Sequence, residues 1–199
     1  FYIFVCSSHY VMKIRTKTRK NKSGDERKYA YLVFSKRRKK SKRPPKQRFS
    51  KYLGRVIELF PAPKQCQTMP NNAKQCQTMP NNAPQTPSES IVQMFKQLLL
   101  SAEFQRVNKH IFRRGDVEVD LSVLTVKSIE TGQQLCIQAN EGFISKYTLR
   151  KIVRYKPPET TEKEIGQDLA KRLLSSGLKP SQEVFLALYY QILKNLHRK

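Results

Sequence analysis

The chain is divided by its residues 61–87, which read PAPKQCQTMPNNAKQCQTMPNNAPQTP. Six prolines interrupt a segment that is otherwise polar and rich in Asn and Gln, a composition typical of a linker. Within it, the decapeptide KQCQTMPNNA occurs at 64–73 and again, unchanged, at 74–83. Two short copies do not make a repeat array, so their identity indicates a recent duplication in a segment that tolerates insertion. We therefore expect two parts, residues 1–60 and 88–199, joined by a flexible linker.

The part before the linker has the alternation of apolar and charged residues that is typical of β-strands. Residues 12–17 alternate in this way. In 29–34, Tyr29, Tyr31 and Val33 alternate with Ala30, Leu32 and Phe34, and turn residues around Gly24 lie between the two segments. A third strand is expected at 48–59, after a basic loop at 36–46 that contains two prolines. The sequence thus predicts a small, basic, antiparallel sheet, which would be marginal unless another surface covered its apolar face.

The part after the linker mixes helical and strand patterns, so the predicted fold class is α+β. A first helix is expected from an N-cap at Ser88 to about Val107. Strands of a β-meander are expected at 117–121, 124–129 and 135–139. Further helices are expected at 142–155, from the capping-box pair Thr161 and Glu164 to Gly177, and at 181–197.

Positive charge is concentrated at the N-terminal end. The formal net charge is +24, and residues 1–63 hold 19 Lys or Arg against only Asp25, Glu26 and Glu58. This density costs self-repulsion in the free protein, and a polyphosphate offsets that cost because its bound counterions are released. We interpret the N-terminal part as a nucleic-acid-binding module, with DNA favoured and RNA an open alternative.

The candidate contacts lie on the predicted strands, in the basic loop and on the helix at 142–155. On the helix, Lys146, Arg150 and Arg154 recur every four residues, although such a stripe is as often a solvated face. The others are Lys13, Arg15, Lys17, Arg37, Arg38, Lys39, Lys42, Arg43, Arg48, Lys51 and Arg55. We expect these residues to contact the phosphate backbone, which gives affinity with little sequence discrimination.

Aromatic residues are interleaved with these cations. They are Tyr29, Tyr31, Phe34, Phe49 and Tyr52. Such rings stack on unpaired bases in single-strand-binding proteins. At strand spacing they more often form the apolar face of a sheet, and that interpretation is preferred here.

Three carboxylates, Asp116, Glu118 and Asp120, alternate along one predicted strand. Convergent carboxylates can hold Mg²⁺ against a phosphate. A solvated strand face is the stronger interpretation, because metal-dependent phosphoryl enzymes draw their carboxylates from several elements. The expected ion-pair partners are Arg113, Arg114 and Lys127.

No convergent nucleophile and base, and no phosphate-cradling glycine loop, is found in the sequence. The four cysteines are spread too widely for a disulfide framework or a zinc site, so free thiols are expected. We expect no catalytic residue, no metal and no cofactor, and the balance of features is against an enzyme.

Two motifs, KYAYLV at 28–33 and KYLGRV at 51–56, flank the basic loop. They resemble the N-terminal region of some prokaryotic insertion-sequence transposases of the DDE type, where a similar strand pair precedes the catalytic domain. The resemblance covers residues 12–59 and implies contact with transposon ends or with DNA in general. No catalytic carboxylate is carried over, since residues 88–199 show no matching RNase-H-like array. The resemblance therefore implies a relative without strand-transfer activity.

Together these features predict a DNA-binding, transposase-related protein without an intact catalytic site. Two alternatives stay open: a ribosome- or RNA-associated basic protein, and a metal-dependent DNA-processing enzyme. The apolar residues 1–6 are too few to cross a bilayer, so no membrane partner is expected. In a prokaryote, the expected location is cytoplasmic, on the nucleoid or the ribosome.

Overall fold

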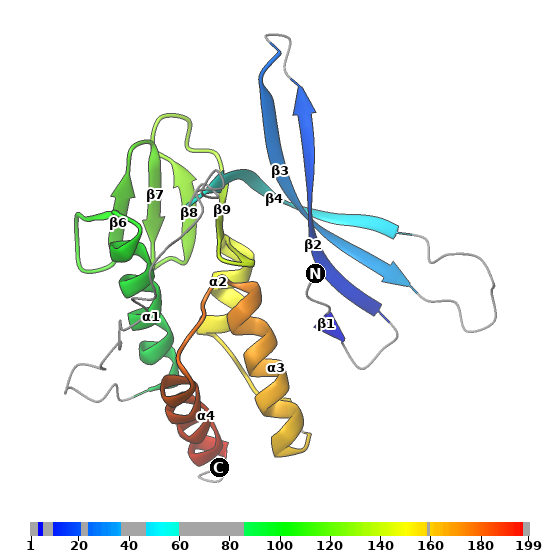
Figure 1. Cartoon of the computed structure of the whole chain (residues 1–199), viewed down its shortest axis with the longest axis vertical. Coiled ribbons are helices and arrows are strands. Elements are labelled where there is room, and N and C mark those ends of the chain that lie inside the picture. The colour runs from blue at the N-terminus through cyan, green and yellow to red at the C-terminus, as the bar shows by residue number, and fades with distance from the viewer. Residues whose placement is uncertain are drawn as a thin grey trace, which may run out of the picture.

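The computed structural model describes residues 4–5, 10–20, 24–36, 47–59, 86–158 and 160–196 (Figure 1). It confirms the α+β class, with antiparallel N-terminal strands and C-terminal helices. One sheet has six strands in the order β1 (Phe4–Val5), β2 (Tyr10–Lys20), β3 (Glu26–Lys36), β4 (Gln47–Glu58), β9 (Leu135–Ala139) and β10 (Gly142–Ile144). A second has four: β5 (Gln105–Arg106), β6 (Ile111–Arg114), β7 (Val117–Asp120) and β8 (Thr125–Ser128). The helices are α1 (Pro87–Ser101), α2 (Lys146–Val153), α3 (Glu162–Ser175) and α4 (Gln182–Leu196).

The six-stranded sheet crosses from one part of the chain to the other. Strand β4 pairs in parallel with β9, in a register that runs from Arg55 opposite Leu135 to Glu58 opposite Gln138. Gly54, immediately before this junction, has φ +135°, and a Cβ there would lie 2.7 Å from the backbone oxygen of Gln134. Only glycine allows the two backbones to approach so closely. The N-terminal strands are therefore completed by C-terminal strands rather than forming a sheet of their own.

Strand β9 contributes to two apolar clusters because its side chains alternate between its faces. Cys136 joins Ala30, Leu32 and Leu53 in a small cluster on one face of the N-terminal strands, against which Phe143 and Tyr147 pack. This is the covering surface that the thin sheet was expected to need.

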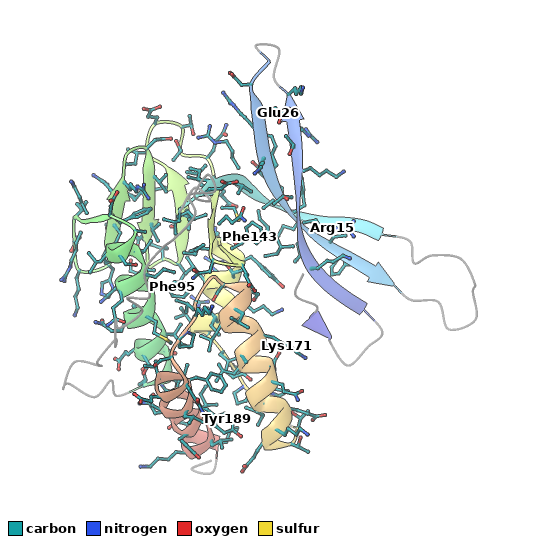
Figure 2. All side chains as sticks on the ribbon, viewed as in Figure 1. Arg15, Glu26, Phe95, Phe143, Lys171 and Tyr189 are labelled. Atoms are coloured by element: carbon teal, nitrogen blue, oxygen red, sulfur yellow. The ribbon has the colours of Figure 1, made fainter. Side chains whose placement is uncertain are left out.

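The opposite face of β9 belongs to the main core. Leu135, Ile137 and Ala139 are buried there together with residues of the second sheet and of all four helices, Phe95 and Leu169 among them (Figure 2). Arg114 links β6 to the ends of β4 and α1. Its Nη1 donates hydrogen bonds to the backbone oxygens of Leu59, at 3.1 Å, and Ala102, at 3.0 Å. It was expected to pair mainly with a strand carboxylate.

The first helix begins and ends earlier than predicted. Its N-cap is Thr86 rather than Ser88, and Thr86 forms a capping box with Glu89, while Pro87 takes the first turn, where its missing N–H costs nothing. The last two residues of the expected linker are thus the N-cap and the first residue of the helix, and residues 61–85 lie outside the described residues. The helix ends at Ser101, and part of the segment predicted to continue it to Val107 forms β5.

The helix predicted at 142–155 was also wrong at its start. Gly142–Ile144 form β10, and α2 begins only after Ser145, which caps it together with Thr148. Gly142 packs so tightly on the backbone of Leu174 and Gly177 that no side chain fits there. The capping box of Thr161 and Glu164 is confirmed, as is Gly177, with φ +82°, beyond the end of α3. Within the described part of the chain, no helix is long and apolar enough to span a membrane.

Candidate nucleic-acid interface

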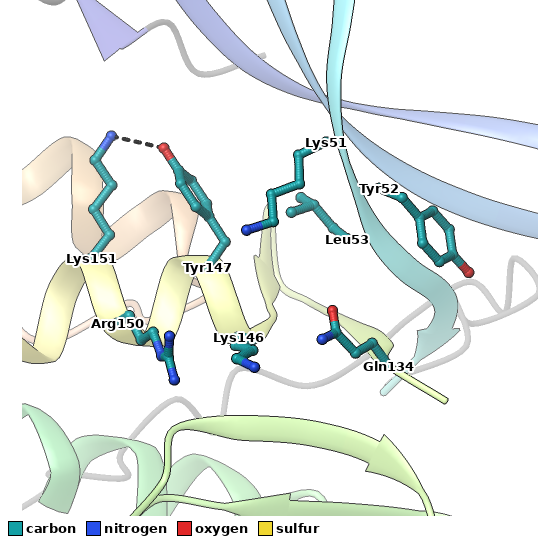
Figure 3. Close-up of a pocket in the computed structure, with 8 residues that line it drawn as sticks. All are labelled: Lys51, Tyr52, Leu53, Gln134, Lys146, Tyr147, Arg150 and Lys151. Atoms are coloured by element: carbon teal, nitrogen blue, oxygen red, sulfur yellow. Dashed lines mark hydrogen bonds between the residues drawn. The ribbon is translucent and has the colours of Figure 1, made fainter. Parts of the chain in front are cut away.

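A pocket of about 390 Å³ lies between β4 and α2 (Figure 3). Four cations line it: Lys51 from β4 and Lys146, Arg150 and Lys151 from α2. Its other lining residues are Tyr52, Leu53, Gln134 and Tyr147. No carboxylate is among the described residues that line it, so in this part of the structure the positive charges meet without a negative charge between them.

The helix α2 presents these groups because its turns repeat every 3.6 residues. Leu149 and Ile152 are fully buried in the main core, which leaves the opposite face of the helix toward β4. On that face Tyr147 packs against the small apolar cluster, and its hydroxyl accepts a hydrogen bond from Lys151 Nζ at 3.2 Å. Lys151 Nζ also lies 5.4 Å from the Tyr147 ring centroid, a cation–π distance. Tyr147 thus packs α2 against the N-terminal strands and positions Lys151, one of the cations that line the pocket.

The wall opposite α2 is an open part of β4. In the described residues, the register with β9 begins only at Arg55, so Lys51 and Leu53 lie beyond the last paired position on that edge. Figure 3 shows Lys51 extending toward Tyr147 and Tyr52 extending away from α2. Neighbouring residues of one strand point to opposite faces of the sheet. The strand therefore connects the pocket with the other face of the N-terminal sheet.

That other face carries a group of three tyrosines. Tyr31 lies opposite Tyr52 in the register, and their ring centroids are 5.5 Å apart, while Tyr29 lies 6.3 Å from Tyr52. Tyr52 remains 45% exposed. Partial burial, followed by its neighbour Tyr29, raises the pKa of the Tyr52 phenol. We call the side of the N-terminal strands that carries these three rings the tyrosine face.

The preferred interpretation of the aromatic residues was therefore wrong for these tyrosines. The apolar face of the N-terminal strands is formed by Ala30, Leu32 and Leu53. The alternation puts Tyr29, Tyr31 and Tyr52 on the side away from that cluster. Phe34 pairs with Arg48 in the register, and the side chain of Phe49 lies outside the described residues.

Several predicted contact residues fall on the tyrosine face. Lys13, Arg15 and Lys17 on β2 lie opposite Val33, Tyr31 and Tyr29, and Arg55 lies opposite Tyr29 on β4. Arg19 continues the alternation, and its guanidinium carbon lies 6.0 Å from the Tyr29 ring centroid. The same alternation in the sequence was a signal for Arg19, although it was not selected from the sequence.

The other predicted contacts divide into three groups. Lys51, Lys146 and Arg150 meet at the pocket, whereas Arg154 is the exposed C-cap of α2 and does not line it. Arg37, Arg38, Lys39, Lys42 and Arg43 lie outside the described residues, as does the side chain of Arg48. Gln134 and Tyr147 were missed, because only the tertiary fold brings them beside β4.

The three carboxylates of the alternative metal site have separate structural roles. Asp116 accepts hydrogen bonds from the Glu130 backbone N–H and from Ser128 Oγ, and these lower its pKa, the bond from Glu130 most. Asp120 accepts from the backbone and hydroxyl of Ser122 in the turn after β7. In the part of the chain that the structure describes, no group of three His, Cys, Asp or Glu side chains could hold a metal ion.

Glu118 corrects the expectation of a solvated strand face. Its side chain is only 8% exposed, yet it pairs as expected with Arg113, at 2.7 Å, and Lys127, at 2.9 Å. These partners flank it in the register on β6 and β8. The hydrogen bond from Lys127, followed by that from Arg113, lowers the pKa of Glu118 against the opposing effect of burial. This carboxylate stabilises the second sheet.

Cys136 is a free thiol, as expected, and it is fully buried in the small apolar cluster. Burial raises its pKa to about 12. A thiol reacts as the thiolate, so Cys136 is unsuited to be a nucleophile at neutral pH.

Comparisons with protein-family models, with curated proteins and with solved structures found no match for this chain.

Proposed function

We propose that this protein binds nucleic acid and holds backbone phosphate in the pocket between β4 and α2. The observation that carries the proposal is the pocket's lining, in which the described residues include Lys51, Lys146, Arg150 and Lys151 but no carboxylate. Two groups of cations that are far apart in the sequence, one on the N-terminal strands and one on α2, meet at this site. A bound phosphate would offset their mutual repulsion.

The charges around the pocket favour a polyanion over a small anion. The N-terminal part holds 19 Lys or Arg in residues 1–63, and a chain of phosphates can engage many of them and release a counterion at each contact. The few carboxylates of this part offset little of that charge, and Glu26 pairs with Lys20 at 3.3 Å and Glu58 with Lys28 at 2.6 Å. Affinity would come mostly from such backbone contacts, which carry little sequence information.

DNA is the favoured target, and the similarity of residues 12–59 to transposase N-terminal regions remains a hypothesis in its support. Structured RNA is the alternative. In a prokaryote, binding to DNA would be compatible with a location on the nucleoid, and binding to RNA would be compatible with association with ribosomes.

A salt titration of a paired variant tests the proposal. In Lys146→Gln/Arg150→Gln the full chain should bind a duplex DNA more weakly, and the negative slope of log K against log salt should become less steep by about 0.9 for each phosphate that the variant no longer neutralises. The matched control is Lys163→Gln/Lys194→Gln, which removes the same charge from exposed positions at the start of α3 and the end of α4. Its slope should stay near that of the unchanged protein.

Two results would contradict the proposal. If both paired variants show the same fall in affinity, net charge rather than the pocket controls binding. If the unchanged protein binds neither duplex DNA, single-stranded DNA nor duplex RNA of equal length at low salt, the proposal is wrong.

A further inference from the structure

We infer that the tyrosine face stacks unpaired bases while the pocket holds the adjoining phosphates, so that the ligand is a single strand. This inference rests on the proposed function and adds the class of nucleic acid. It starts from Tyr52, which lines the pocket and also contacts both other rings of the tyrosine face. The two features therefore meet at this position of β4, with the pocket on one face of the strand and the ring on the other.

A nucleic-acid strand can connect the two features because β4 has an open edge at this point. β9 pairs with β4 only from Arg55 onward in the described residues, so no described strand covers this edge of β4 at Lys51 and Tyr52. A nucleic-acid backbone that crosses this edge passes from the rings on one side of the sheet to the cations on the other. The crossing requires a flexible chain, and a duplex is stiff over such a distance.

The chemistry of the tyrosine face suits bases better than it suits a protein core. The rings are tilted at 44° and 52° to one another and are not covered by the apolar cluster, which lies on the other side of the sheet. Aromatic side chains that remain accessible on a strand offer π-faces to any base, whatever its identity. In a duplex the bases are stacked on one another and do not present these faces, so only unpaired bases can use the rings.

The charges on the same face complement a polyanion. Strand alternation puts Lys13, Arg15, Lys17 and Arg19 of β2 and Arg55 of β4 on the side of the tyrosines. Glu26 lies opposite Lys20 and Glu58 pairs with Lys28, and the same alternation assigns these four residues to the other side of the sheet. On the described strands β2, β3 and β4, the tyrosine face thus carries cations and rings without a carboxylate. A carboxylate from outside these strands, that of Asp116 just before β7, interacts electrostatically with Arg55. An acidic peptide would also satisfy the charges, but it offers no planar bases to the rings.

The test compares Tyr52→Ala with Tyr52→Phe in the full chain. Tyr52 is the most exposed of the three tyrosines, so among them its replacement should disturb the fold least. Loss of one stacked base should weaken binding of a twelve-nucleotide single-stranded DNA about fivefold to a hundredfold. Tyr52→Phe should retain most of the affinity because its ring remains, and duplex binding should be the same in all three proteins.

An abasic oligonucleotide supplies the matched ligand control. A twelve-nucleotide strand with abasic sites keeps every phosphate but has no bases at those sites, so the unchanged protein should bind it about as weakly as Tyr52→Ala binds the normal strand. Replacing one base by 2-aminopurine gives a direct signal, since its fluorescence should be quenched by the unchanged protein and by Tyr52→Phe but not by Tyr52→Ala.

The outcomes separate this inference from the proposed function. Equal binding of normal and abasic strands, or equal weakening of single-strand and duplex binding in Tyr52→Ala, would overturn the stacking inference and leave phosphate binding intact. Competition by polyglutamate at the same concentration of charge as the DNA strand would also overturn it. If the unchanged protein bound no nucleic acid, both proposals would be wrong. Thermal unfolding of the two variants checks that a missing signal does not come from a failure to fold.

Discussion

The two apolar clusters of this protein differ greatly in size and share one strand. Among the described residues, the main core gathers side chains from the second sheet, from helices α1 to α4 and from one face of β9, whereas the small cluster has only Ala30, Leu32, Leu53 and Cys136 as its buried members. Because hydrophobic stabilisation grows with the apolar area removed from water, the main core supplies most of the stability. The N-terminal strands, with their cations and partly exposed tyrosines, contribute little of it. The residues proposed to bind nucleic acid thus lie largely on strands whose position depends on the main core.

This comparison predicts that damage to the main core unfolds both parts. Phe95 is fully buried in it, so Phe95→Ala should lower the free energy of unfolding by about 3 to 5 kcal/mol (Figure 2). Chemical denaturation should show one transition, with hydrogen exchange faster in β2, β3 and β4 as well, because β9 loses its support. Unchanged protection in the N-terminal strands would show that they fold without the main core.

Damage to the small cluster should have a smaller and more local effect. Leu32→Ala removes a buried side chain from it and should cost about 2 to 3 kcal/mol, at the lower end for such a change, because a small cluster can relax around the gap. Hydrogen exchange should become faster in β2, β3 and β4 while β6, β7 and β8 keep their protection. Equal loss of protection in both sheets would show instead that the two clusters form one cooperative unit.

The smallest predicted effect concerns the ion pairs of Glu118 in the second sheet. The folded pKa of Glu118 is lowered from an unfolded value of about 4.3, so the ion pairs stabilise the fold above that pH, and their contribution is lost as the pH falls through the folded pKa. Glu118→Gln should cost about 1.5 kcal/mol at pH 7, near the lower end for charged hydrogen bonds, because Arg113 and Lys127 are half-exposed and can be hydrated.

Urea unfolding between pH 7 and pH 3 measures this difference. The gap between the unchanged protein and Glu118→Gln should close as the pH falls. The control Glu183→Gln, at an exposed carboxylate in the first turn of α4, should show a smaller gap. A gap for Glu118→Gln that stays constant down to pH 3 would show that packing, rather than ionisation, explains its effect.

The sequence predicted those parts of the fold that depend on local patterns. Alternation identified the N-terminal strands, and the spacing of Thr161 and Glu164 located the start of α3. The same spacing between Thr86 and Glu89 was present in the sequence and would have corrected the start of α1. The segment 142–155 was misassigned because three apolar-rich residues before Ser145 fit a helix as well as a short strand.

The candidate site was predictable only in part. Charge density pointed to the N-terminal strands and to α2, and Lys51, Lys146 and Arg150 were selected from it. Their convergence depends on the parallel pairing of β4 with β9, a contact between distant segments that leaves no local signal in either strand. The direction of the tyrosines was missed for a related reason, since which face of the N-terminal strands is buried depends on Cys136 and Phe143 in the C-terminal part.

The parallel pairing of β4 with β9 also has a consequence for how the chain matures. The ribosome synthesises β2, β3 and β4 well before Leu135–Ala139. Until β9 is made, the edge of β4 is therefore unpaired and the apolar face around Leu32 is uncovered. Unpaired strand edges attract one another, and lysines and arginines along a strand oppose such association. The positive charge that suits these strands to a polyanion would then also oppose association between incompletely synthesised chains until β9 pairs with β4.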